Sequence, residues 1–191
     1  MLGWIIEKID HVSLNSDLEK NVFQPLDMIS TFYSPTHIAL SQFVPTEYQK
    51  DRGGIIQGKV HDYKAYLLDG ISGHAGLFST LDDLTQFANV FLNGGKYKDV
   101  QVFPSLMYTL LKNPLYRQND RTLGWKLWEY HKNMFWHSGF TGTSIALDLD
   151  NKEAYICLTN RIYPTRSNSA WIKERRKTLS IFFNEKEAVR K

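Results

Sequence analysis

The residues with the clearest chemical potential lie in one short segment, in which His137, Ser138 and Gly139 are followed by Thr141 and Gly142. The hydroxyls supply hydrogen-bond donors, and the glycines omit side chains where a ligand or another backbone approaches a strand closely. The segment therefore predicts a strand with an open edge that a ligand can reach. The alternative is a tight turn between two buried strands, with His137 as a hydrogen-bonded core residue, since single short motifs are weak evidence.

A second group of polar residues lies upstream, where His61 and Asp62 precede a loop that contains His74. This loop has three glycines within residues 70–76, which predicts a tightly folded turn with positive φ angles. The spacing of the histidines and the carboxylate matches no standard zinc pattern, and no thiolate accompanies them. We therefore expect no metal and no other cofactor, and we expect these side chains to hydrogen-bond the loop to itself.

The first third of the chain combines short helices with irregular structure. Apolar residues at helical spacing predict an amphipathic helix over residues 2–9. Ser16 opens a capping-box pattern, which predicts a second helix that Pro25 ends. Asp27 suits a left-handed position. Residues 29–58 contain many turn formers, which indicates a long excursion over the surface.

Two further helices are predicted in the middle of the chain. Thr80 precedes two carboxylates and an apolar stripe, so a helix should begin there and end at Gly94. Pro104 opens another helix through about Lys112. Residues 116–122 are interpreted as a polar linker.

The last third predicts antiparallel strands closed by a helix. Strands are expected at residues 123–128, around Trp136, and at residues 144–149 and 153–159, with a turn at residues 131–133. A final helix should run from Ala170 to about residue 184. Its sheet-facing residues are expected to be Ile172, Leu179 and Phe183, and its solvated residues Lys173, Arg175, Arg176 and Lys177. The whole order is an α+β pattern, an antiparallel sheet flanked by helices.

Composition limits the classes of protein that the chain can represent. Its 191 residues are 42% hydrophobic, which is a globular composition with enough chain for one core. A net charge of +3 is too small to indicate nucleic-acid binding. The one cysteine, Cys157, is expected to be a small buried hydrophobe. No stretch has transmembrane length, and the apolar start lacks the features of a signal peptide, so the cellular compartment stays open.

Several stretches in fixed order carry a family resemblance. They are Pro25-Leu26-Asp27-Met28, the run from Gly73 to Thr80 that continues into Asp82-Asp83-Leu84, His137-Ser138-Gly139, and Leu158-Thr159-Asn160-Arg161. With these stretches the chain resembles the carboxy-terminal part of the serine beta-lactamase-like hydrolases. This group includes class C beta-lactamases, penicillin-binding DD-peptidases and related esterases.

The resemblance implies covalent acyl transfer, with an activated serine as nucleophile. It places His137 where many relatives have lysine, and it makes the backbone N–H of Phe140 one half of an oxyanion hole. It further implies that Ser138, Gly139 and Thr141 contact a substrate, which would be a small molecule or a peptidoglycan-like compound.

The chain also departs from the family pattern. No serine is followed three residues later by lysine, and Tyr-x-Asn does not occur. We therefore expect one incomplete domain over residues 1–191, mainly helix and loop in 1–122 and strands plus a helix in 123–191. Such a chain should be inactive alone, and its open sheet edge should pair with an amino-terminal half or with a second copy. Two alternatives are a non-catalytic binding module for a peptidoglycan-like or acyl ligand, and an unrelated α+β domain that matches by chance.

Overall fold

The structure of the protein is a computed structural model that describes the backbone of residues 1–128 and 133–188. The chain divides into two compact units. Unit 1 comprises Met1–Leu84 and Asn160–Asn168, and unit 2 comprises Thr85–Thr159 and Ser169–Lys191. Each unit is described by itself below.

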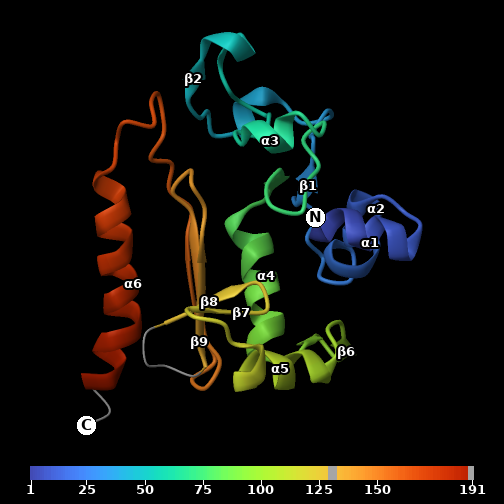
Figure 1. The fold of residues 1–191 in the computed structure, drawn as a ribbon, viewed down its shortest axis with the longest axis vertical. Helices are drawn as coiled ribbons and strands as arrows, with labels where there is room; N and C mark the ends of the chain where they lie inside the picture. Colours follow the sequence, from blue (N-terminus) through green and yellow to red (C-terminus); the bar gives the residue numbers. More distant parts are fainter. Residues whose placement is uncertain (129–132, 189–191) are drawn as a thin grey trace. The chain divides into compact units, whose positions relative to one another are not determined.

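Unit 2 is built on a five-stranded antiparallel sheet with the strand order β11-β10-β9-β8-β7 (Figure 1). The strands are β7 (Arg121–Thr122), β8 (Trp125–Leu127), β9 (Met134–Ser138), β10 (Ser144–Asp148) and β11 (Glu153–Cys157). Consecutive strands are neighbours throughout, as short connections between antiparallel strands require. The predicted α+β class with an antiparallel sheet is confirmed.

Helices cover both faces of this sheet (Figure 1). On one face, α4 (Leu81–Leu92) and α5 (Ser105–Lys112) contribute Ala88, Phe91 and Leu111 to a core that includes Phe135 and Leu147 of the sheet. On the other face, α6 (Ala170–Ala188) buries Leu179 and Phe183 against Trp128, Met134 and Ala146. Neighbouring residues of β9 enter opposite cores because side chains alternate along a strand. Each large side chain buried in this way contributes about 1.5–3 kcal/mol.

The rest of unit 2 is a small hairpin and a short turn. The hairpin joins β5 (Lys96–Tyr97) to β6 (Val100–Gln101), and a 3-10 helix spans Pro114–Tyr116. Gly94 and Gly95 follow α4 with φ angles of 67° and 89°, so the helix ends at the predicted glycine.

Unit 1 consists of short elements. Its helices are α1 (Leu2–Asp10), α2 (Leu14–Leu18), a π-helix (Glu19–Phe23), α3 (Tyr63–Tyr66) and 3-10 turns at Leu40–Gln42 and Lys50–Arg52. Two ladders pair β1 (Phe32–Tyr33) with β4 (Leu77–Phe78) and β2 (Tyr48–Gln49) with β3 (Gly54–Ile55). The buried carboxylate of Glu47 binds the guanidinium of Arg166, so the segment 160–168 is tied to β2. Residues 29–58, predicted as a long excursion, contain only short strands and 3-10 turns among irregular segments.

Several details of the sequence-based prediction are wrong. The second helix begins at Leu14 rather than after Ser16, because the hydroxyl of Ser13 accepts the hydrogen bond from the Ser16 N–H and provides the cap. The predicted linker at residues 116–122 contains β7. Cys157 is half-buried. Ile172 is exposed, because the first turns of α6 direct Trp171 and Arg175 toward residues 139–143, to which both donate hydrogen bonds.

Expectations for Asp27, for the turn at residues 131–133 and for membrane-spanning helices have the following outcomes. Asp27 has a φ angle of 54°, so its predicted left-handed conformation is confirmed. The turn predicted at residues 131–133 lies outside the described residues except for its last position. Within the part of the chain that the structure describes, no helix combines the length and the apolar character needed to cross a membrane.

Candidate active site

The end of β9 carries His137 and Ser138 beyond its pairing with β8. On one side, β10 pairs with β9 along its whole length, up to the partners Ser138 and Ser144. On the other side, β8 pairs only as far as Trp136. The side chain of His137 is exposed and that of Ser138 is half-buried, so the alternative of a buried core histidine does not describe this structure.

The register also gives the direction of the backbone groups of Ser138. The N–H of Gly139 donates to the Thr143 carbonyl at 2.8 Å, so it faces β10. Backbone groups of successive residues alternate between the two sides of a strand. The N–H and carbonyl of Ser138 therefore face the edge that β8 leaves uncovered.

The residues that follow β9 form a tight hairpin loop over residues 139–143. The N–H of Gly142 donates to the Gly139 carbonyl at 3.2 Å, which closes a β-turn. Gly142 has a φ angle of 128°, a conformation that other residues rarely adopt. The space beside Gly139 is filled by the Thr143 hydroxyl, with which an added Cβ would collide. The absent side chain thus accommodates Thr143, whereas the sequence had suggested a ligand or another backbone.

The electrostatic surroundings of His137 favour its neutral form. Partial desolvation lowers the pKa of His137, and the positive charges of Arg121 and Lys126 lower that pKa further. The Lys126 ammonium lies 4.9 Å from the centre of the Trp136 ring, beside the strand. At pH 7 the imidazole is therefore neutral within a basic environment, which suits hydrogen bonding to an anionic group. The sequence alone gives no signal that Arg121 and Lys126 lie near His137.

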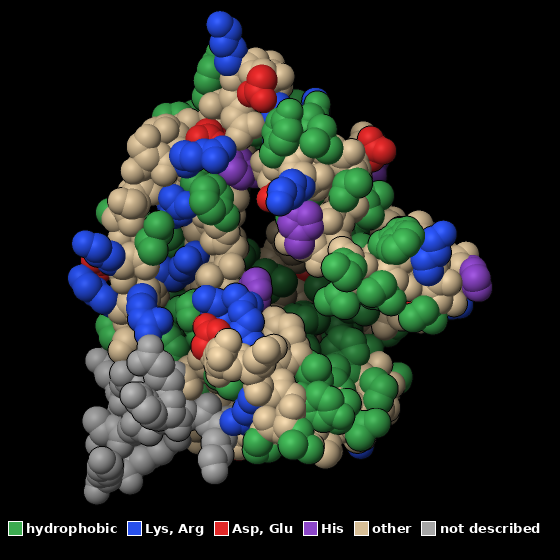
Figure 2. All heavy atoms as spheres, in the orientation of Figure 1, with side chains coloured by type: hydrophobic (Ala, Val, Ile, Leu, Met, Phe, Trp, Pro, Cys, Tyr) green, Lys and Arg blue, Asp and Glu red, His purple; other side chains and the backbone are tan. Residues whose placement is uncertain are grey.

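Basic residues also gather on α6. Figure 2 shows several Lys and Arg side chains on the part of unit 2 where α6 lies. Lys173, Arg176 and Lys177 are exposed there, as predicted for a solvated face. Arg175 is half-buried, and its guanidinium donates to backbone carbonyls of the hairpin loop. The assignment of Arg175 to the solvated face is therefore wrong.

The upstream polar residues separate into two pairs within unit 1. His74 Nε2 lies 2.9 Å from Asp62 Oδ1, and His74 Nδ1 lies 2.7 Å from the Ser72 hydroxyl, so these side chains hydrogen-bond the loop as expected. His61 instead lies 3.0 Å from Glu47. Within the described residues, no three His, Cys, Asp or Glu side chains are grouped so that they could hold a metal ion.

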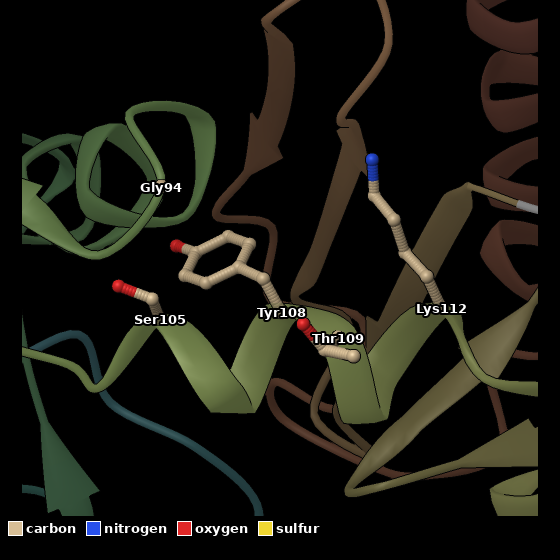
Figure 3. A pocket seen from close by; sticks show the side chains of 5 residues that line it. All are labelled: Gly94, Ser105, Tyr108, Thr109 and Lys112. Atoms are coloured by element: carbon tan, nitrogen blue, oxygen red, sulfur yellow. The ribbon is translucent and has the colours of Figure 1, made fainter.

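A shallow hollow of about 300 Å³ lies on α5 of unit 2 (Figure 3). Ser105 and Tyr108 extend from α5 on the side of the turn at Gly94, and the Tyr108 hydroxyl donates to the Val90 carbonyl at 2.7 Å. Burial raises the pKa of Tyr108 to about 12, so this phenol stays protonated. The hollow contains none of the site residues expected from the sequence.

Comparison with known proteins identifies the class. The model of the family described as Beta-lactamase matches residues 1–180. The chain belongs to the beta-lactamase family.

Among curated relatives, the chain is similar to the N-acetylmuramyl-L-alanine amidase of Bacillus subtilis. The two are 33% identical over 186 residues, which cover 84% of this chain and 42% of the relative. The chain therefore spans less than half the length of this relative.

Solved structures show the same fold. A penicillin-binding protein homologue from Pyrococcus abyssi has a TM-score of 0.60 at 17% identity, over 95% of this chain and 40% of that one. A penicillin binding protein from Bacillus halodurans has a TM-score of 0.61 at 16% identity, over 93% of this chain and 52% of that one.

Proposed function

We propose that this chain supplies the sheet-edge part of a serine acyl-transfer site, and that the reacting serine comes from a segment outside its 191 residues. The observation that supports this most directly is the end of β9, where His137 is exposed and the backbone of Ser138 faces the edge with which β8 does not pair. A strand edge of this kind can align an extended substrate through backbone hydrogen bonds.

Each residue at this edge has a distinct role in the proposal. The N–H of Phe140 donates to the oxygen that becomes negative as the acyl carbon turns tetrahedral. Ser138 and Thr141 hydrogen-bond the bound substrate, and Gly139 allows the backbone to turn directly after the strand. His137, which is neutral at pH 7 because its pKa is lowered, orients the substrate by hydrogen bonding rather than as a fixed cation.

The nucleophile must come from elsewhere because the chain has neither Ser-x-x-Lys nor Tyr-x-Asn. In the proposed reaction a serine oxygen bonds to the acyl carbon, and the amine or alcohol leaves with a proton. Water then cleaves the acyl-serine bond and releases the acid. An amide donor without this serine cannot complete either step, so the chain should be inactive alone.

The basic surroundings of His137 favour an acyl substrate with a carboxylate. Arg121 and Lys126 both act on His137 electrostatically, so a negative group bound there would be stabilised. The Bacillus subtilis relative is named as an amidase of N-acetylmuramyl-L-alanine. We infer that a small peptidoglycan-like compound is the substrate class for the complete site here.

A fusion protein tests the proposal. An amino-terminal region that contains Ser-x-x-Lys, taken from a member of the beta-lactamase family, is joined to Met1. Turnover of nitrocefin, a p-nitrophenyl ester and a muramyl-L-alanine amide is then measured. We expect turnover by the fusion, none by the chain alone, and a loss when Ser138 is replaced by alanine. A folded fusion that binds the muramyl peptide without turning it over would support the binding-module alternative instead.

A further inference from the structure

The hairpin loop after β9 is held by donors from α6. We propose that Arg175 and Trp171 are positioning residues that orient the Gly139–Phe140 peptide, so that the Phe140 N–H faces the open edge of β9. This inference rests on the proposed function, because it assigns the orientation of the oxyanion donor to side chains remote from the reacting atoms.

Three side chains donate to carbonyls of this loop. One guanidinium nitrogen of Arg175 lies 2.8 Å from the Gly139 carbonyl oxygen and 3.3 Å from that of Thr143. The indole nitrogen of Trp171 donates to the Gly142 carbonyl at 2.8 Å, and the Thr159 hydroxyl donates to the same oxygen at 2.6 Å. The loop carbonyls are thereby paired on the side of α6 and β10.

The direction of the Gly139 carbonyl determines the direction of the Phe140 N–H, because both belong to one trans peptide. The peptide unit is planar, and its C=O and N–H point in nearly opposite directions. The Gly139 carbonyl is directed at Arg175 and also accepts from Gly142 across the hairpin. The Phe140 N–H in the same peptide must therefore point away from Arg175 and away from β10, which is toward the edge that β8 leaves uncovered.

The same contacts explain why a cation stands at position 175. The carbonyl oxygens of Gly139 and Thr143 both lie within 3.3 Å of one guanidinium nitrogen, and their partial negative charges repel one another when no donor lies between them. A charged donor forms stronger hydrogen bonds than a neutral one. Arg175 is half-buried, so its bonds compete with less water than those of its exposed neighbour Arg176.

One labelled peptide makes the orientation measurable in the 191-residue chain. Gly-Phe occurs once in the sequence, at residues 139–140. Protein made with carbonyl-13C glycine and 15N phenylalanine therefore gives a single peak in a carbonyl–amide correlation spectrum. That peak reports the acceptor carbonyl of Gly139 and the N–H of Phe140 together.

Substitutions on α6 then separate positioning from general packing. We expect Arg175→Met to move this peak in both dimensions, Arg175→Lys to move it less, and Trp171→Phe to move it through the neighbouring carbonyl. Arg176→Met removes the same side chain one residue further along and should leave the peak in place. An Arg175→Met peak that coincides with the unsubstituted one would refute the inference, and so would equal movement in Arg176→Met.

The fusion protein adds a kinetic readout. Because the oxyanion donor acts on the transition state, Arg175→Met should lower kcat by about tenfold or more and change KM little. A raised KM with unchanged kcat would contradict a positioning role. If the unsubstituted fusion shows no turnover, the proposed function fails, whereas the labelled peptide still decides whether Arg175 orients the loop.

Discussion

The ion pair between Glu47 and Arg166 allows a quantitative prediction about unit 1. Glu47 is buried, and its carboxylate accepts from the Arg166 side chain at 2.6–2.9 Å through three contacts. His61 at 3.0 Å and Gln49 at 3.1 Å are its other side-chain partners. This pair connects the segment 160–168 to the start of β2. The strand also donates a backbone hydrogen bond to this segment, from the Tyr48 N–H to the Pro164 carbonyl at 2.9 Å.

The loss of stability expected when Arg166 is replaced depends on which hydrogen-bond partners the Glu47 carboxylate keeps. Removing one partner of a fully buried pair costs about 3–5 kcal/mol, because the other charge stays buried alone. Here His61 and Gln49 still bind Glu47, and Arg166 is itself half-exposed. We therefore expect Arg166→Met to destabilise unit 1 by about 2 kcal/mol, below the fully buried range.

Hydrogen exchange measures this loss locally. A loss of about 2 kcal/mol corresponds to about 30-fold faster exchange of amides that open with the segment, such as those of Thr46 and Ile56. Peptides from β10 in unit 2 should exchange as before. Lys50→Met, which removes an exposed cation from the same region, serves as the matched control.

The pH dependence provides a second check with a definite sign. Hydrogen bonds from Arg166 hold the pKa of Glu47 well below its usual range. A carboxyl with a depressed folded pKa stabilises the protein above its unfolded pKa of about 4.3, and this stabilisation is lost as the pH falls toward the folded pKa. The difference between the parent and Arg166→Met should therefore be full at pH 6 and shrink below about pH 4. Equal exchange in Arg166→Met, Lys50→Met and the parent at pH 6 would refute this reasoning.

Three further outcomes follow from the structure. Gly139→Ala should destabilise unit 2 by about 1–2 kcal/mol in urea unfolding because the new Cβ meets the Thr143 hydroxyl, and adding Thr143→Ala should recover most of that loss. Asp83→Ala should lower the free energy of unfolding of unit 1 by about 2 kcal/mol, because buried Asp83 accepts hydrogen bonds from the Ser30 N–H at 2.8 Å and from the Thr31 hydroxyl. Asp82→Ala, at the exposed neighbouring position, should leave the stability unchanged. NMR titration should give His137 a pKa below its ordinary value; the contribution of this histidine to the free energy of unfolding is then present above the unfolded pKa of about 6.5 and falls as the pH drops through it.

Local rules predicted the helices and strands because their signals lie within a few residues. The carboxylates after Thr80 and the glycines after residue 93 mark both ends of α4, and the antiparallel order follows from short connections. The same rules failed where two local signals compete. Ser13 and Ser16 are both suitable caps, and only the observed hydrogen bond decides between them.

The candidate site was only partly predictable for a different reason. His137 and Ser138 are adjacent in a recognisable motif, so their strand could be found from sequence. Arg175 lies 36 positions from Gly139 in the sequence, and its contact with that carbonyl depends on how α6 packs against the sheet. A helical surface rich in Lys and Arg gives no sign of which cation turns inward.

The most direct test of the central claim is a crystal structure of the fusion protein with a boronic acid bound to its serine. The account predicts that one boronate oxygen lies about 2.7–3.1 Å from the Phe140 nitrogen, at the end of β9 beside Ser138. A boronate attached to the serine whose oxygens all lie far from Phe140 would contradict it.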